Sequence, residues 1–296
     1  AGATNTELAT LAEAMEGAAA GYDLANASYD SVSFSVSSQD TLPFGIAFNA
    51  DGTKMFIVGH TGNAVYEYTL STGFDISTSS FVDSFSVSAQ GVNPFDIAFN
   101  TDGTKMFIVD GGTDNLSEYT LSTGFDVSTA SYSQNMSGGA SPSGVTFNAD
   151  GTKMFIVRQG ATDVVSEYTL STGFDISTAS FVDSVNIGSQ DTVPQAIAFN
   201  ADGTTMFIVG NTGDDINYYS LTTGFDISTA SFVNSFSVAS QDTTPKGIAF
   251  NANGSKMFIT GQVGDSVYQY STALYINKMD KTQLDAVTDP NQVTLG

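Results

Sequence analysis

The sequence predicts an all-β chain that folds as a closed five-bladed β-propeller. The first observation is a ten-residue block, NADGTKMFIV at 49–58, which recurs four times with small changes. The copies are marked by Asp51, Asp102, Asp150, Asp202 and Asn253, which are spaced 51, 48, 52 and 51 residues apart. Periods of this length are typical of propeller blades and exceed those of leucine-rich or ankyrin repeats.

The second observation is the strand pattern inside one repeat. Four short β-rich runs follow one another: GIAFN (45–49), KMFIV (54–58), VYEYTL (65–70) and FVDSFSVS (81–88). An Asp-Gly turn joins the first two runs, and Gly73 with Asp75 turns the chain before the fourth. Four antiparallel strands of this kind make one blade, with the first run as the inner strand and the fourth as the outer strand.

The third observation is one displaced outer strand. SYDSVSFSVS at 28–37 precedes the first inner strand, whereas the last repeat stops after its third strand, VYQYST at 267–272. The N-terminal strand is therefore expected to complete the last blade and leave no exposed edge. The repeats span about 27–78, 79–129, 130–178, 179–229 and 230–272, and an open array within a longer chain is the alternative.

The segments on either side of the repeats lack the strand pattern. Residues 1–26 are predicted to form an N-terminal helical attachment segment, because apolar residues recur at helical spacing between 4 and 20. Residues 273–296 are predicted to be a tail or linker. Both segments are expected to contact other proteins or sister chains.

The composition excludes several classes of partner. A formal net charge of −23 and a pI near 4.1 argue against binding to nucleic acid or to an anionic membrane. The acidity favours solubility, with cation binding as the alternative. The chain has no cysteine, and the repeats suggest no cofactor.

Residues able to catalyse are few. His60 is the only histidine and is expected to be a solvated loop side chain. The five inner strands are nearly apolar, and Asp96 alone breaks their pattern. This argues against a catalytic channel, so the chain is predicted not to be an enzyme. The alternative is a propeller hydrolase or lyase with a metal in the central channel.

Acidic loops before three inner strands are weak candidates for a metal site. The motif SQDT places Asp40, Asp191 and Asp242 in equivalent positions of three repeats. If these loops converge at the channel mouth, the carboxylates form a partial ring. Gly91 and Ser141 stand near the matching places of the other two repeats, so we predict no metal.

Two loops differ among the five copies, while the two turns at the other end of the repeat scarcely change. Both variable loops are expected on one face, because alternate loops of an antiparallel blade emerge on the same side. This face is the predicted ligand-binding surface, with unconstrained drift as the alternative. Its candidates are His60, Asp110, Arg158, Gln159, Gln195, Asn211, Asp214, Asp215, Lys246 and Gln262.

The combination of N-x-DGTKMFIV, VYEYTLSTGFDIST and AS(F/Y)VDS resembles repeat modules in structural proteins of tailed bacteriophages, particularly marine ones. The ending INKMDKTQLDAVTDPNQVTLG is similar to a segment of tail-fibre-like phage proteins. The resemblance implies a structural and adhesion module on a virion or extracellular surface. It implies contacts with other virion or surface proteins through 4–20 and 273–296, binding of a host glycan or receptor, and leaves homo-oligomerisation open. No catalytic residue carries over.

Overall fold

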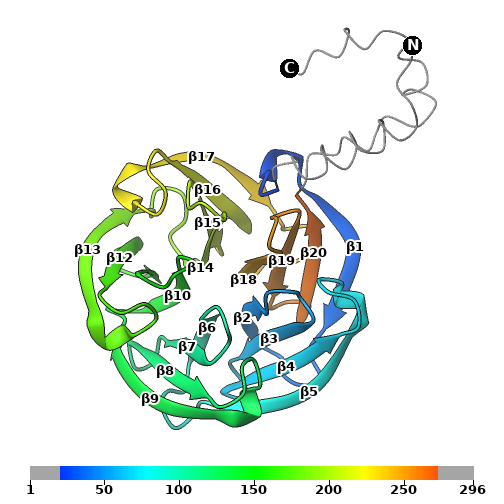
Figure 1. Ribbon diagram of the computed structural model, residues 1–296. Helices are drawn as coiled ribbons and strands as arrows, with labels where there is room; N and C mark the ends of the chain where they lie inside the picture. Colours follow the sequence, from blue (N-terminus) through cyan, green and yellow to red (C-terminus); the bar gives the residue numbers. More distant parts are fainter. Residues whose placement is uncertain (1–20, 273–296) are drawn as a thin grey trace, which may run out of the picture.

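Five four-stranded antiparallel sheets surround a central channel (Figure 1). The computed structural model describes residues 21–272. Blade one contains β2 (Pro43–Phe48), β3 (Lys54–Gly59), β4 (Ala64–Leu70) and β5 (Ser79–Ser86). Blade two contains β6 (Pro94–Phe99), β7 (Lys105–Asp110), β8 (Asn115–Leu121) and β9 (Ala130–Ser137). Blade three contains β10 (Pro142–Phe147), β11 (Lys153–Arg158), β12 (Val164–Leu170) and β13 (Ala179–Asn186).

The last two blades complete the ring. Blade four contains β14 (Pro194–Phe199), β15 (Thr205–Gly210), β16 (Asp215–Leu221) and β17 (Ala230–Ser237). Blade five contains β18 (Pro245–Phe250), β19 (Lys256–Gly261), β20 (Ser266–Ser271) and β1 (Ser28–Ser35). The predicted fold is therefore confirmed: five antiparallel blades are closed by an N-terminal outer strand.

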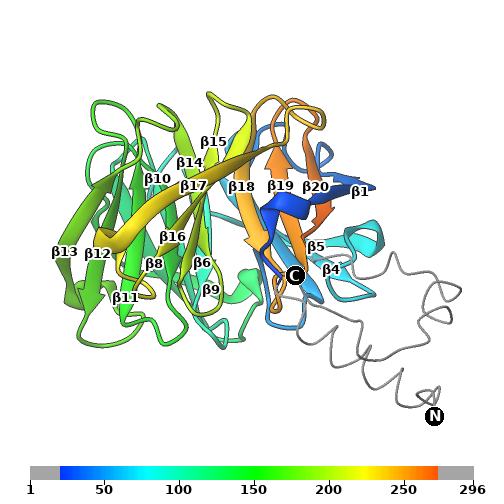
Figure 2. The ribbon, with the colours of Figure 1, turned by 90° about the horizontal axis from the view of Figure 1, so that it is seen from above.

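Connections leave the disc on two opposite faces (Figure 2). We call the side with the loops before the inner strands and after the second strands the loop face. Backbone bonds such as His60 N–H to the Leu42 carbonyl, at 3.0 Å, join these two loops and place them together, as predicted. The opposite side, with the inner hairpin turns, is the turn face.

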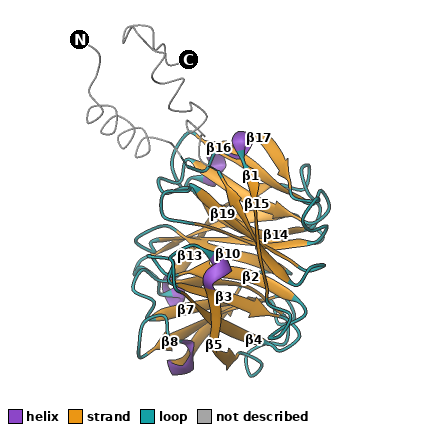
Figure 3. Ribbon diagram, turned by 90° about the vertical axis from the view of Figure 1, so that its right-hand side faces the viewer, coloured by secondary structure: helices purple, strands orange, loops and turns teal. Residues whose placement is uncertain are grey.

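The helical part of residues 21–272 is confined to five short 3₁₀ turns (Figure 3). They are η1 (Leu24–Asn26), η2 (Ile76–Thr78), η3 (Val127–Thr129), η4 (Ile176–Thr178) and η5 (Ile227–Thr229). Each begins after an aspartate; Asp75, for example, accepts a 3.1 Å hydrogen bond from the Ser77 N–H. None of these helices is long and apolar enough to span a membrane.

The Asp-Gly pairs serve as turn residues, as the sequence indicates. Asp51 accepts hydrogen bonds from the backbone N–H of Thr53 at 3.0 Å and from its hydroxyl at 2.6 Å. These bonds lower the pKa of the Asp51 carboxyl below its usual value. The carboxylate therefore rigidifies the hairpin that begins blades one to four, and the Asn253 amide oxygen accepts the equivalent bond in blade five.

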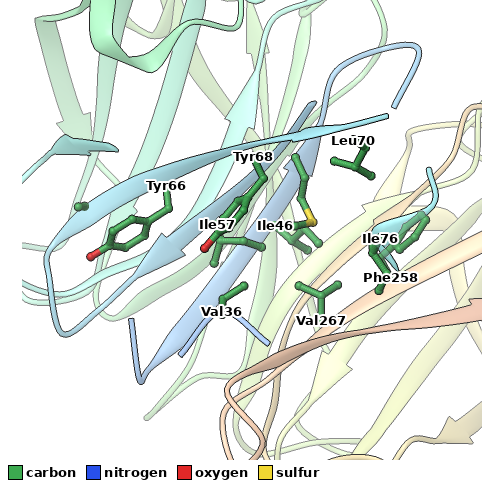
Figure 4. Close-up of a cluster of buried hydrophobic side chains, with 11 residues drawn as sticks. Val36, Ile46, Ile57, Tyr66, Tyr68, Leu70, Ile76, Phe258 and Val267 are labelled. Atoms are coloured by element: carbon green, nitrogen blue, oxygen red, sulfur yellow. The ribbon is translucent and has the colours of Figure 1, made fainter. Parts of the chain in front are cut away.

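The hydrophobic core lies between neighbouring blades (Figure 4). Met55 and Ile57 of blade one pack with Phe258 and Val267 of blade five, and these side chains are fully buried. The same arrangement recurs at every blade boundary. Burying these apolar side chains against the next blade is the main force that holds the ring together.

An ion pair links one blade to the next at three boundaries. Lys54 lies 2.6 Å from Glu67 on the adjacent strand and also donates to the carbonyl of Phe125 in blade two. The other oxygen of Glu67 accepts from the Val127 N–H at 3.0 Å. Because Glu67 is buried, these contacts satisfy a carboxylate that would otherwise destabilise the fold.

The ring closes through both β1 and the residues before it. β1 pairs with β20 from Ser28 opposite Ser271 onward. The preceding segment, from Tyr22, supplies the turn that the fifth repeat lacks, and Tyr22 packs 4.9 Å from the ring of Phe250. The last blade thus includes the residues from Tyr22 onward, whereas the strand pattern predicts only the strand that begins at residue 28. The predicted helix at 4–20 and the tail at 273–296 lie outside the described residues.

Candidate functional site

The channel contains a cavity of about 370 Å³, a volume suited to a small organic molecule. One aliphatic side chain from each inner strand contributes to its wall, together with polar groups such as Thr101, Thr146 and Asn251. The aliphatic side chains are Ile46, Ile97, Val145, Ile197 and Ile248. The wall continues to Asn148, Ala149 and Ala252 at the hairpin turns, so the cavity is reached from the turn face.

Asp96 is the only carboxyl group among the described residues that line this cavity. It is 5% exposed and accepts a 2.9 Å hydrogen bond from the backbone N–H of Val145 in blade three. Glycine at position 45 leaves the room for it, because a Cβ there would overlap the Asp96 side chain. Burial raises the pKa of Asp96 to about 7, which places its titration at physiological pH.

Above Asp96, five side chains close the loop-face end of the channel. They come from the second residue of each inner strand, and we call them the mouth ring: Phe44, Phe95, Ser143, Gln195 and Lys246. The repeats are otherwise nearly identical in these strands, yet this position differs in chemistry from blade to blade. None of the five lines the cavity beneath.

The mouth ring is aromatic on one side and polar on the other. The rings of Phe44 and Phe95 lie 4.9 Å apart. Lys246 Nζ lies 5.0 Å from the centre of the Phe44 ring and donates to Gln195 at 3.1 Å. Ser143 donates to the Pro194 carbonyl at 2.8 Å. These contacts close the channel on the loop face.

Lys246 is an unusual group in this acidic chain. It is 8% exposed, and it makes none of the ion pairs found in residues 21–272. Burial lowers the pKa of the Lys246 amine to about 8. A buried cation held by an amide and an aromatic face favours a site for recognition over a purely structural position.

A second tier lies on the mouth ring. It consists of the residue after each second strand: His60, Gly111, Gln159, Asn211 and Gln262, each of which donates its backbone N–H to the preceding loop. Gln159 accepts from the Gln195 amide at 3.2 Å. The expectation of a solvated His60 is wrong, because its ring is half-buried and stacks on Phe95 at 5.8 Å.

The structure brings only part of the predicted loop-face surface together. His60 and Lys246 both contact Phe44, and Lys246, Gln195 and Gln159 form one hydrogen-bonded row. Asn211 and Gln262 share the second tier by position. Asp214 and Asp215 lie at the start of β16, where Asp215 accepts from Asn217 at 2.7 Å. Asp110 and Arg158 end strands β7 and β11 and lie over the neighbouring third strands.

The acidic loop residues tie the two loops of one blade together. Asp40 accepts from Leu42 N–H at 2.8 Å and from Gly62 N–H at 2.7 Å, and Gly59 leaves the room for its carboxylate. Asp191 and Asp242 make equivalent bonds in their own blades. In blade two the aspartate and the glycine exchange positions. Asp110, after the second strand, supplies the carboxylate, and Gly91, before the inner strand, has no side chain to overlap it.

These carboxylates therefore do not converge on one mouth as a partial ring. Among residues 21–272 no three His, Asp or Glu side chains gather closely enough to hold a metal ion. In the channel, the lone carboxyl of Asp96 already accepts a backbone hydrogen bond. The described residues therefore do not fit the acidic metal site that a hydrolase or lyase with a metal in the channel would require.

The fold and its channel define a propeller with one buried acid in a closed-ended cavity. The chain belongs to the lactonase family described as a seven-bladed β-propeller, which it matches over residues 15–294. The part of the chain described here contains five blades. No curated protein has a sequence that matches this chain.

Several solved structures have a similar fold. A gluconolactonase from Xanthomonas campestris is 13% identical with a TM-score of 0.50, over 77% of this chain and 71% of that protein. A putative 6-phosphogluconolactonase from Bacteroides fragilis is also 13% identical with a TM-score of 0.45, over 68% of this chain and 57% of that protein. Virginiamycin B lyase from Staphylococcus aureus is 13% identical with a TM-score of 0.45, over 81% of this chain and 98% of that protein. This chain spans about three fifths of several matched structures, 62% of a Desulfotomaculum acetoxidans protein among them.

The family match overturns the interpretation as a bacteriophage tail-fibre repeat. The phage resemblance rested on the turn and strand blocks, which are the parts that any blade of this fold needs. The predictions of a non-enzymatic adhesion module and of a virion or extracellular-surface location depended on that resemblance and are wrong for the same reason. The prediction that the chain is not an enzyme, which rested on the apolar inner strands, is contradicted by the same family match.

Proposed function

We propose that this protein is a hydrolase that opens a small cyclic ester in the channel cavity, with Asp96 as the general base. The observation that carries the proposal is a buried carboxyl with a pKa of about 7 in the wall of the channel cavity. Membership of the lactonase family supports the choice of a lactone as the substrate class.

The reaction needs a proton acceptor beside the attacking water. The Val145 N–H donates to one oxygen of Asp96 at 2.9 Å and fixes the carboxyl, which in the proposed reaction accepts a proton from water. The water oxygen then forms a bond with the lactone carbonyl carbon. When the ring C–O bond breaks, the proton passes from Asp96 to the leaving oxygen, which yields a hydroxy acid and restores the carboxylate.

The rest of the cavity positions the substrate and limits water. Its aliphatic side chains contact the carbon ring of a lactone, and its polar groups, such as Thr146 and Asn148, are available to ring substituents, so the site favours a small ring. The mouth ring closes the channel beyond Asp96, so substrate and water enter from the turn face. A base in such a site is effective because few other water molecules compete for it.

Lactone hydrolysis by purified protein tests the proposal. A panel of five- and six-membered lactones is followed by acid release against a buffer blank. We expect at least one lactone to be opened, with kcat/KM that rises as pH passes through about 7, because the base must be ionised. Asp96→Asn is expected to lower kcat/KM by about 100-fold or more.

The matched control is Asp183→Asn, which removes an exposed carboxylate from outer strand β13 and leaves the rate unchanged. If wild-type protein opens no lactone of the panel faster than the blank, the proposed function is wrong. Wild-type rates in a folded Asp96→Asn protein reject Asp96 as the base instead.

A further inference from the structure

Blade three lacks the carboxylate that ties the two loops in the other four blades. Its loop before the inner strand is three residues shorter, and Gly139 stands near the place of the missing aspartate. At the position of Gly59, Gly210 and Gly261, blade three carries Arg158. One blade thus places a guanidinium where each of the others gathers backbone N–H groups around an acid.

Arg158 is held in place but only partly satisfied. One terminal nitrogen donates to the Ser166 hydroxyl at 3.0 Å, and the side chain packs against Gly139. The Nε atom is buried and has no hydrogen-bond partner among the described residues. The ion pairs within residues 21–272 join lysines to glutamates and do not include Arg158. A buried N–H without a partner destabilises a fold by about 1–3 kcal/mol, so an acceptor for the Arg158 Nε–H would stabilise this blade.

Neighbouring loop groups are already bonded and do not compete for that acceptor. Ser141 N–H donates to Asp114 of blade two at 2.8 Å, and Gly160 N–H donates to Asp163 at 3.0 Å. Arg158 Nε is therefore the buried side-chain donor in the described part of this blade that lacks an acceptor. A guanidinium offers parallel N–H groups, whose geometry matches the two oxygens of a carboxylate.

We propose that Arg158 binds the carboxylate of a small organic acid between the two loops of blade three. The ligand supplies from solution the negative group that Asp40, Asp110, Asp191 and Asp242 supply within the other blades. The inference is independent of the proposed hydrolase, because Arg158 does not line the channel cavity.

A role as space filler is the competing explanation. The aliphatic part of Arg158 occupies room left by the shorter loop. Methionine fills a similar volume without a charge or a buried donor, so Arg158→Met separates the two roles. Lys246→Met is the matched control, because it removes a buried cation of the loop-face side and leaves Arg158 intact.

The test uses the fact that Arg158 is the only arginine of the chain. Protein labelled with ¹⁵N-arginine gives a single Nε–H signal, which is followed while sodium acetate replaces sodium chloride at constant ionic strength. We expect a saturable downfield shift of the proton with acetate and no such shift with chloride. Acetate should also raise the melting temperature of wild type and of Lys246→Met by about 2 °C at saturation, but not that of Arg158→Met.

Three outcomes overturn the proposal. The Nε–H signal remains unchanged by acetate, chloride moves it equally, or Arg158→Met keeps the acetate-specific rise in melting temperature. The result is distinguishable from failure of the proposed hydrolase, because none of these readouts depends on lactone hydrolysis.

Discussion

Replacing Asp96 by asparagine is expected to stabilise the fold at alkaline pH while it removes the proposed base. Burial raises the pKa of Asp96 from 3.8 to about 7, so the folded protein disfavours the ionised carboxyl. Each pH unit of this difference corresponds to about 1.36 kcal/mol. Above pH 7 the ionised side chain therefore lowers the free energy of unfolding by up to about 4 kcal/mol.

The sign follows from proton binding. Between pH 3.8 and 7 the unfolded chain has released the Asp96 proton while the folded chain retains it, so stability falls as pH rises. Asparagine has no proton to lose, and its amide oxygen can still accept the Val145 N–H. The advantage of the Asp96→Asn variant should grow by about 2.5 kcal/mol between pH 5 and pH 8.

Urea unfolding of both proteins at several pH values, followed by circular dichroism, measures this difference. Asp183→Asn should follow the wild type throughout, because that carboxylate is exposed. A constant difference between Asp96→Asn and wild type from pH 5 to pH 8 would refute the reasoning, because it would show that Asp96 titrates normally in the fold.

Three further predictions concern other parts of the ring. Lys246→Met should raise the free energy of unfolding by up to about 3 kcal/mol at pH 7, a gain that shrinks between pH 8 and 10 in urea titrations, because the buried amine has a lowered pKa. Asp40→Gly and Gly59→Asp should each destabilise by about 2 kcal/mol, while the double variant recovers most of the loss in a double-mutant cycle. Removing residues 1–35 should lower the melting temperature by at least 10 °C, and a peptide of residues 21–37 should restore it in calorimetry. Additive losses in the second case, or an unchanged melting temperature in the third, contradict the structure.

The repeat made the fold predictable, whereas the site depends on facts that no single repeat contains. The strand pattern recurs five times and the Asp-Gly turn four times, with Asn-Gly in the fifth copy, so each copy supports the prediction from the others. Asp96 differed from its equivalents, but a lone acid in an apolar strand gives no sign that five strands bury it beside a cavity. His60 follows a strand, so the sequence predicts a solvated loop residue. Its burial depends on stacking against Phe95, which comes from another blade.

Two further signals in the sequence correspond to features of the structure. Gly59 with Asp40, and Gly91 with Asp110, exchange glycine and aspartate between the same two positions, which indicates that the side chains share one space. The segment GYDLANAS at 21–28 matches GFDISTAS of the other turns, and Tyr22 takes the place of the conserved turn phenylalanine of the copies. The first signal is found by comparing two loop positions together across the copies. The second is found by comparing the turn sequences as well as the strands.

The ring closure sets an order on folding during synthesis. Among the strands of residues 21–272, β1 is made before its partner β20 by the length of the whole ring, and Ser28 pairs with Ser271. Blades one to four are continuous in sequence and can each form as soon as they are complete. Until β20 has been made, β1 has an open edge and these blades form an unclosed arc, so this is the period when pairing with another chain competes with closure.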